Sequence, residues 1–293
     1  MRALIIMTLL VPIFCVFLMI LSYKHVDTQP TPLPPQPPPQ PQEQKPGDKV
    51  IWTDFKPIKN LSDPNWGIYL TDIENHLHPS LGNQYRDSDK VTWSHETTHG
   101  IHSWLNNNLQ KQRDSYYFYV GYNKAAGIKQ PKFKIADVAK IIPKSLQKSR
   151  YNLYLIRQQQ GWNNEPLYLW DEWIAYCNGI ECGIELTKKG NYKPNKNDSC
   201  FAVLEFSVYA TYVAMTQKSK DPNYDNKQLL EFLAWNLDRS MKLYQEGKKL
   251  NAYNWDDDQY LKHVQTHEDA KEFRQFLVNT YGKKWTKEVF NFE

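Results

Sequence analysis

The sequence predicts an α+β fold that is predominantly α-helical and carries a small β element within residues 49–293. Helical patterns of apolar residues recur over most of that stretch, and one aromatic run has the composition of a β-strand. Residues 1–24 are predicted to lie in a membrane and residues 25–48 to form an extended linker, so neither segment is expected to contribute to a folded core. About 245 residues remain (293 less 48), enough for one sizeable core or two closely packed lobes.

The first part of the chain, residues 1–24, is predicted to be a signal anchor that crosses the membrane as one helix. Residues 3–23 carry no charge and are long enough to span a hydrocarbon core of about 30 Å. A cleaved signal peptide is the alternative, and the protein would then be secreted. The apolar run is longer than a usual signal-peptide core, and no small-x-small cleavage site follows it. We expect a single-pass membrane protein that contacts the lipid bilayer through residues 3–23, with its distal domain extracytoplasmic.

The second part, residues 25–48, is predicted to be a proline-rich linker. Residues 30–47 hold half of the 18 prolines of the chain, and proline removes the amide donor that helices and sheets need. In the polyproline II conformation this stretch would extend roughly 50 Å. We interpret it as a stiff spacer that holds a domain away from the bilayer, and a ligand for proline-binding domains is the alternative.

The elements of the third part, residues 49–293, follow from local patterns. Residues 49–88 are expected to be irregular with short strands. Ser88 or Asp89 can cap a helix over 90–108, and the aromatic run 116–122, YYFYVGY, is expected to be a strand. The remaining segments are expected to be helical: 135–141, 144–160, 166–176 with Gly179 as its stop signal, 201–217, 227–247 and 257–282.

Charge and cysteine content narrow the function classes. The formal net charge of +4 is spread along the chain, with no arginine-rich stripe and no nucleic-acid-binding motif, so no nucleic-acid partner is expected. In an oxidising compartment Cys177, Cys182 and Cys200 would allow one disulfide and leave one thiol over. The Cys-x4-Cys spacing is not that of a zinc ribbon.

The segment 92–105, TWSHETTHGIHSWL, carries the strongest chemical signal. On a helix, His95 and His99 are neighbours on one face, and two imidazoles at that spacing can hold one Zn²⁺ at about 2.0–2.1 Å each. Glu96 stands beside that face, where it can act as the base for a water that the metal activates. The other interpretation is a metal-free helix whose histidines form hydrogen bonds within the core.

His102 lies on nearly the same face but is not expected to be a metal ligand. With a rise of 1.5 Å per residue, it sits about 7–8 Å along the axis from the midpoint of His95 and His99. It could reach the same ion only if the helix broke at Gly100. We expect it to contact a ligand residue or the substrate.

A catalytic zinc needs a third protein ligand and an open position, and Glu172 is the predicted ligand. It stands in the apolar and aromatic stretch LWDEWIAYCNG, where an unpaired acid is costly to bury. Asp171 would point elsewhere, toward a ligand imidazole or a lysine. Tyr176, one turn further on, could donate a hydrogen bond to the oxyanion of a tetrahedral intermediate. A helix end with an exposed acidic pair is the alternative.

HETTH on one helix with a glutamate on a later helix resembles the zincin metalloproteases in their gluzincin arrangement. The resemblance implies a zincin-like domain in which His95, His99 and Glu172 bind Zn²⁺ and Glu96 is the general base. It also implies an edge strand that pairs with an extended peptide or protein substrate. Residues 116–122 and residues 66–70, WGIYL, compete for that role.

The sequence therefore predicts a membrane-anchored zinc metallopeptidase with His95, His99 and Glu172 as metal ligands and Glu96 and Tyr176 as catalytic residues. One alternative is a cell-wall or glycan amidase that uses the same zinc site. The other is a metal-free, membrane-tethered binding protein, since ten tryptophans and 19 tyrosines suit a recognition surface as well as a core.

Overall fold

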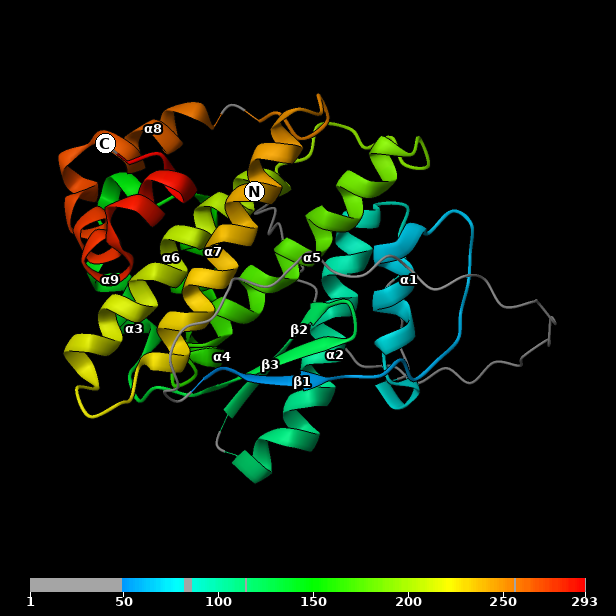
Figure 1. The fold of residues 1–293 in the computed structure, drawn as a ribbon, viewed down its shortest axis with the longest axis horizontal. Helices are drawn as coiled ribbons and strands as arrows, with labels where there is room; N and C mark the ends of the chain where they lie inside the picture. The colour runs from blue at the N-terminus through cyan, green and yellow to red at the C-terminus, as the bar shows by residue number, and fades with distance from the viewer. Residues whose placement is uncertain (1–48, 82–85, 114, 256, 293) are drawn as a thin grey trace, which may run out of the picture.

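The computed structural model describes residues 49–81, 86–113, 115–255 and 257–292 (Figure 1). These residues are mostly helical, with a small β element, as the sequence predicted; the β element is a three-stranded antiparallel sheet of order β1-β3-β2. The predicted membrane helix and proline-rich linker lie outside the described residues. The elements are β1 Ile51–Asp54, α1 Gly67–His76, α2 Lys90–Arg113, β2 Ser115–Gly121, β3 Lys124–Lys129, α3 Ile135–Ile141, α4 Gln159–Trp162, α5 Tyr168–Lys188, α6 Ser199–Lys220, α7 Lys227–Lys248, α8 Asp258–Thr266 and α9 Lys271–Phe290.

Helix α5 lies at the centre of the fold, with α6 and α7 on one side and α1 and α2 on the other (Figure 1). The prediction that this helix stops at Gly179 is wrong, because the helix continues to Lys188. A Cβ at Gly179 would lie 2.9 Å from the carbonyl oxygen of Val91, and one at Gly183 would lie 2.5 Å from the Val91 side chain. Both glycines therefore allow α5 to approach α2 closely, which brings the motif residues of the two helices together.

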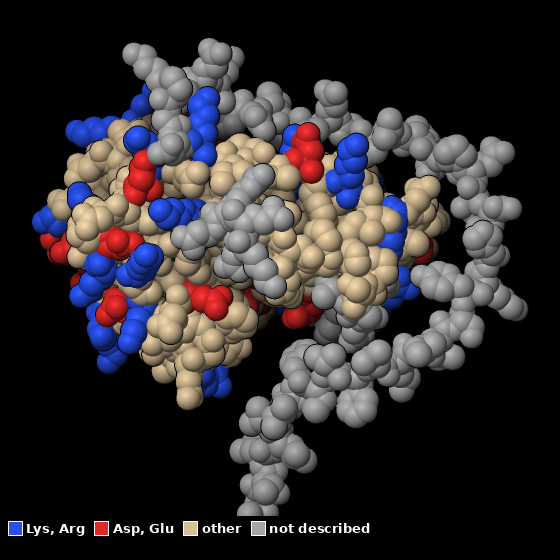
Figure 2. All heavy atoms as spheres, turned by 90° about the horizontal axis from the view of Figure 1, so that it is seen from below, with Lys and Arg blue, Asp and Glu red and all other residues tan. Residues whose placement is uncertain are grey.

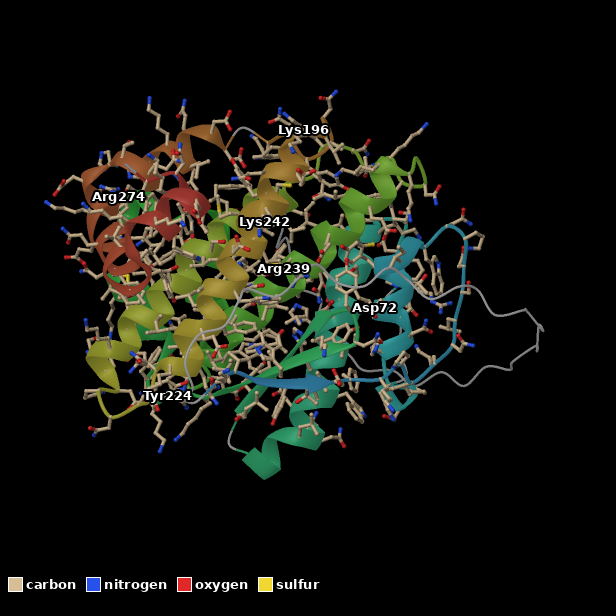
Figure 3. The ribbon with its side chains drawn as sticks, viewed as in Figure 1. Asp72, Lys196, Tyr224, Arg239, Lys242 and Arg274 are labelled. Atoms are coloured by element: carbon tan, nitrogen blue, oxygen red, sulfur yellow. The ribbon has the colours of Figure 1, made fainter. Side chains whose placement is uncertain are left out.

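The small β element contains the predicted aromatic strand, β2, and a partner that the sequence analysis missed. Strand β3 pairs antiparallel with β2 on one side and β1 on the other. The hairpin turns at Tyr122 and Asn123, which have φ of 53° and 59°, and two positive φ values are the mark of a type I′ turn. Asp72 on α1 fixes this turn, since its Oδ2 accepts hydrogen bonds from the Tyr122 amide at 3.0 Å and the Tyr119 hydroxyl at 2.6 Å (Figure 3).

Residues 66–70 do not form an edge strand, because α1 begins at Gly67. Gly67 has φ of +66°, which breaks an extended run and favours glycine. The first amides of the helix, those of Ile68 and Tyr69, donate to the carboxylate of Glu185 at 2.9–3.0 Å. A distant acid thus caps this helix, and its contribution could not be read from the local pattern.

Two segments predicted as single helices are divided. Residues 144–160 form a 3-10 turn at Lys144–Leu146, a π-helix at Tyr151–Arg157 and the start of α4. Residues 257–282 are split into α8 and α9 because His267 is extended, and its side chain accepts the amide of Asp269 at 3.2 Å. Helix α9 continues past Gly282, where a φ of 85° kinks it.

The predicted buried helix 201–217 is confirmed as α6. Among the described residues it is the one helix long and apolar enough to cross a membrane, but 89% of that stretch is buried inside the fold. The three cysteines that would allow one disulfide in an oxidising compartment, Cys177, Cys182 and Cys200, are all free and buried. Cys177 instead packs with its sulfur 3.3 Å from the hydroxyl oxygen of Ser240, and burial raises the pKa of its thiol to about 11. On the face seen in Figure 2, basic and acidic side chains are interspersed.

Candidate metal centre

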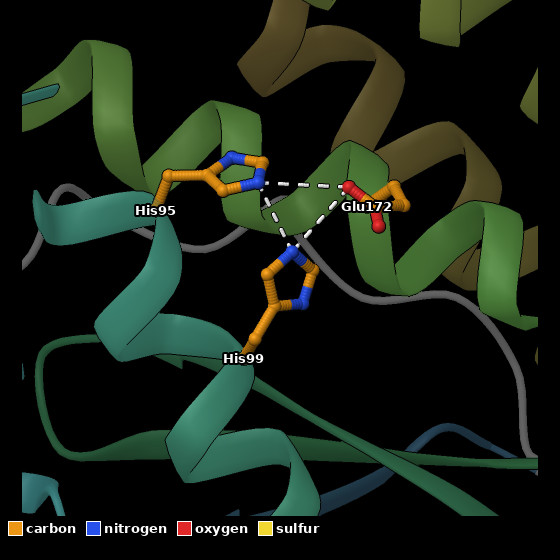
Figure 4. Close-up of side chains that lie close together, drawn as sticks. All are labelled: His95, His99 and Glu172. Carbon is orange, nitrogen blue, oxygen red and sulfur yellow. Dashed lines mark hydrogen bonds and ion pairs between the residues drawn. The ribbon is translucent and has the colours of Figure 1, made fainter. Parts of the chain in front are cut away.

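Helices α2 and α5 bring the three predicted metal ligands together (Figure 4). The Nε2 atoms of His95 and His99 are 3.0 Å apart, and Oε2 of Glu172 lies 3.5 Å from the first and 3.3 Å from the second. Two atoms that each lie about 2.0–2.1 Å from one ion in a tetrahedron are roughly 3.3 Å apart. The three atoms thus form one face of a tetrahedron of the size that zinc needs.

The hydrogen-bonding state of these atoms also fits a cation. Oε2 of Glu172 is buried and has no hydrogen-bond partner among the described residues. Three electron-pair donors that face one another repel unless protons or a metal ion lie between them. The donor set, two imidazoles and one carboxylate, is a common one for catalytic zinc.

Asp171 has the bracing position that the sequence predicted. Its Oδ1 lies 2.5 Å from Nδ1 of His99, and its Oδ2 lies 3.0 Å from both Nδ1 of His102 and the hydroxyl of Tyr116. A proton on Nδ1 of His99, shared with Asp171, leaves Nε2 free to face Glu172. Such a carboxylate fixes the tautomer and ring orientation that metal binding requires.

His102 contacts Asp171 and the backbone of β2, and it is not part of the group formed by the three predicted ligands. Its Nε2 lies 3.2 Å from the carbonyl oxygen of Tyr119, and its Nδ1 faces Asp171. His102, His99 and Asp171 form a second group of potential ligand atoms. Both groups include His99. Its Nε2 faces Glu172 in the first group, and its Nδ1 faces Asp171 in the second.

Charge at the centre favours a cation. Burial alone would raise the pKa of the Glu172 carboxyl, but His99 and His95 outweigh burial and hold it well below its usual range. Burial would likewise lower the pKa of His99, yet Glu172 and Asp171 raise it well above its usual value. Two buried carboxylates therefore create a negative potential at the Nε2 atom of His99.

Three tyrosines lie around the centre. The sequence analysis predicted a role for Tyr176 but did not identify Tyr154 or Tyr168. The hydroxyl of Tyr168 donates to Oε1 of Glu172 at 2.6 Å. The hydroxyls of Tyr154 and Tyr176 are 3.2 Å apart, and the Tyr176 ring lies 4.4 Å from the His95 ring. Tyr168 stands one helical turn before Glu172, a spacing that could have identified it. Tyr154 could not have been found, because it depends on the π-helix.

The ring of Tyr176 makes a cation–π contact with Arg150. The guanidinium of Arg150 lies 5.0 Å from the centre of the Tyr176 ring, within the range of a cation–π contact. Arg150 is itself buried and pairs with Asp198 at 2.9 Å and Glu205 at 3.4 Å. These contacts fix the Tyr176 ring beside His95.

Glu96 lies next to the two histidines and is half-buried. Within the described residues its carboxylate makes no hydrogen bond or ion pair. Burial and the Glu172 carboxylate raise the pKa of the Tyr168 hydroxyl, and Asp171 and Glu96 add to this shift. The His99 side chain is 24% exposed, so solvent reaches the centre.

Asn178 on α5 forms hydrogen bonds with α2, β2 and α7. Its amide nitrogen donates to the carbonyl oxygen of Tyr119 on β2 at 3.0 Å and to Thr98 on α2 at 3.3 Å. Its amide oxygen accepts from Arg239 on α7 at 2.7 Å (Figure 3). Because Arg239 also pairs with Glu181 at 2.5 Å, this network fixes α5 against both α2 and the sheet.

The expectation that residues 116–122 offer an edge for substrate pairing is wrong. Strand β2 is an edge strand by its place in the sheet, but side chains of α2 and α5 occupy its outer edge. Asn106 bonds both the amide and the carbonyl of Tyr117, at 2.8 and 2.9 Å. His102 and Asn178 donate to the carbonyl oxygen of Tyr119. The outer edge of β2 is therefore not free at Tyr117 and at the Tyr119 carbonyl to pair with an extended chain.

Comparisons of the chain with family models, curated proteins and solved structures find no match.

Proposed function

We propose that the protein is a zinc-dependent hydrolase that cleaves peptide bonds. The observation that supports it best is the triangle of His95 Nε2, His99 Nε2 and Glu172 Oε2, with sides of 3.0–3.5 Å. The carboxylate of Glu172 comes from a different helix, and its Oε2 is buried without a hydrogen bond among the described residues. Without a metal, the charge of this buried carboxylate would be offset only by protons on the two imidazoles that face it, and a metal-free binding protein is the alternative.

Each residue of the centre has a role in this proposal. Zinc held by His95, His99 and Glu172 would supply Lewis acidity, which lowers the pKa of a coordinated water to about 7. Glu96, unpaired and next to the ligands, accepts the proton of the attacking water and passes it to the leaving amine. Tyr176 donates a hydrogen bond to the oxyanion that develops on the substrate carbonyl. Asp171 holds His99 in the required tautomer.

Metal removal tests the proposal. The full chain should carry one zinc and cleave some members of a peptide library, lose activity when a chelator removes the metal, and regain it when zinc is returned. A chain that binds no stoichiometric zinc even after zinc is supplied would contradict the hydrolase. Cleavage of peptidoglycan amide bonds, with every peptide left intact, would favour the amidase that uses the same site.

We also propose that residues 3–23 anchor the protein in a membrane and that the proline-rich linker holds the metal centre away from the bilayer. The uncharged run of residues 3–23 supports this proposal. After carbonate extraction of membranes from expressing cells, the full chain is expected in the pellet. A soluble chain whose mature amino terminus lies near residue 25 would show instead that the segment is cleaved and the protein secreted.

A further inference from the structure

Arg150 is a buried cation that contacts Tyr176, and the proposed mechanism assigns it no step. It is 7% exposed and stands immediately before the π-helix Tyr151–Arg157. Burying a guanidinium is costly unless carboxylates and hydrogen-bond acceptors compensate its charge. An arginine that the core keeps buried beside a candidate metal centre therefore calls for a physical explanation.

Two carboxylates hold the guanidinium in place. Its Nη2 lies 2.9 Å from Asp198, and its Nη1 lies 3.4 Å from Oε2 of Glu205 on α6. The other oxygen of Glu205 accepts the backbone amide of Arg150 at 3.0 Å, so one acid fixes both the backbone and the side chain. Because Glu205 is fully buried, the core of the protein sets the position of the guanidinium.

The guanidinium contacts Tyr176, and the Tyr176 ring in turn contacts a proposed metal ligand. The central carbon of the guanidinium lies 5.0 Å from the centre of the Tyr176 ring, and that ring lies 4.4 Å from the ring of His95. Burial would lower the pKa of Arg150, yet Tyr176 and the two carboxylates hold it above its usual value. A chain of direct contacts therefore joins Glu205 in the core, through Arg150 and Tyr176, to the metal centre.

A guanidinium suits this contact because it has hydrogen-bond donors and no acceptor. It can interact with the electron-rich ring of Tyr176, but it cannot accept the hydroxyl proton. The Tyr154 hydroxyl, 3.2 Å from that of Tyr176, has one proton that it can donate to the Tyr176 oxygen. With that arrangement, the single proton of Tyr176 is left for an acceptor at the centre, such as the oxyanion of a substrate.

We propose that Arg150 is a positioning residue for peptide cleavage, which fixes Tyr176 beside His95 with the hydroxyl proton available to the oxyanion. This role rests on the proposed hydrolase, since the oxyanion forms only in that reaction. Within the described residues no hydrogen bond or ion pair joins Arg150 to a proposed ligand, so its replacement should leave zinc bound and lower kcat.

A double-mutant cycle on the full-length, zinc-loaded chain tests this role. Arg150→Lys keeps the charge but not the planar fork, and kcat for the best-cleaved library peptide should fall about 10–100-fold, with little change in KM and full zinc. In the Tyr176→Phe background the same substitution should have almost no further effect, because the hydroxyl that Arg150 positions is already absent. General damage to the fold would instead lower kcat equally in both backgrounds.

Binding of an inhibitor gives a second readout that needs no turnover. The probe is a phosphinate analogue of the same peptide, whose tetrahedral anion stands for the oxyanion. Arg150→Lys should weaken its binding about 10–100-fold in the parent and little in the Tyr176→Phe background. If Arg150→Lys does not fold, Arg150→Met combined with Glu205→Gln removes both buried charges together, and the same cycle is run with Glu205→Gln as its reference.

Arg274→Lys is the matched control, because Arg274 on α9 bonds the backbone carbonyls of Val264 and His267 at 2.8–3.0 Å (Figure 3) and should behave like the parent. Equal losses in the two Tyr176 backgrounds, or no loss in the first, would overturn the role of Arg150 and leave the hydrolase standing. A chain that cleaves no library peptide would overturn both.

Discussion

Replacing Glu172 with alanine is expected to give a folded chain that holds little or no zinc. Glu172 supplies the only carboxylate oxygen of the three-atom face, 3.3–3.5 Å from the two imidazole nitrogens. Without it, only the two imidazoles remain, and the negative charge that attracts a dication falls by one. Zinc content after dialysis against a weak chelator is the measurement, and circular dichroism establishes that the variant folds.

Two variants of neighbouring residues are the controls for this loss. Asp171→Asn and His102→Ala alter contacts behind His99 and leave the three ligand atoms in place. Such outer contacts typically change metal affinity or activity about 10–100-fold, so both variants should still bind zinc when it is supplied. Full zinc in Glu172→Ala together with a metal-free His102→Ala would place the ion in the group of His99, His102 and Asp171 instead.

The helices and the aromatic strand could be predicted because their signals are local. Helix α2 begins near the predicted Asp89 cap, whose carboxylate accepts the Val91 amide at 3.0 Å, and β2 coincides with the aromatic run. The errors share a different cause. Gly179 was taken as a stop signal, but tertiary packing against Val91 explains it. The helix at Gly67 depends on Glu185, more than 100 residues away.

The grouping of the three proposed ligands could be predicted because helical spacing alone joins His95 to His99, and burial cost singles out Glu172. Contacts between side chains of different helices and strands could not be predicted, because they depend on how these elements pack together. Tyr116 reaches Asp171 only because β2 packs on α5, and Tyr154 reaches Tyr176 only because a π-helix replaces the predicted α-helix. The closed edge of β2 depends on Asn106, a residue with no distinctive sequence signal.

Replacing Glu96 with glutamine is expected to leave zinc bound and to stop most turnover. Its carboxylate is not one of the three ligand atoms and makes no hydrogen bond or ion pair within the described residues, so the fold and the metal centre do not depend on its charge. A glutamine has nearly the same shape but cannot accept the proton of the attacking water. General bases typically contribute 10²–10⁴-fold to a rate, and kcat for peptide cleavage should fall by about that factor.

Glu165→Gln is the matched control, because Glu165 is another partly buried glutamate near the centre. Burial and the nearby Asp171 raise the pKa of Glu165, yet the proposed mechanism gives it no role, so this variant should keep both zinc and kcat. Loss of zinc from Glu96→Gln would mean that Glu96 supports the fold or binds the ion. A zinc-loaded Glu96→Gln that cleaves peptides at the parent rate would mean that another group takes the proton. That result would refute water attack assisted by Glu96 at this centre.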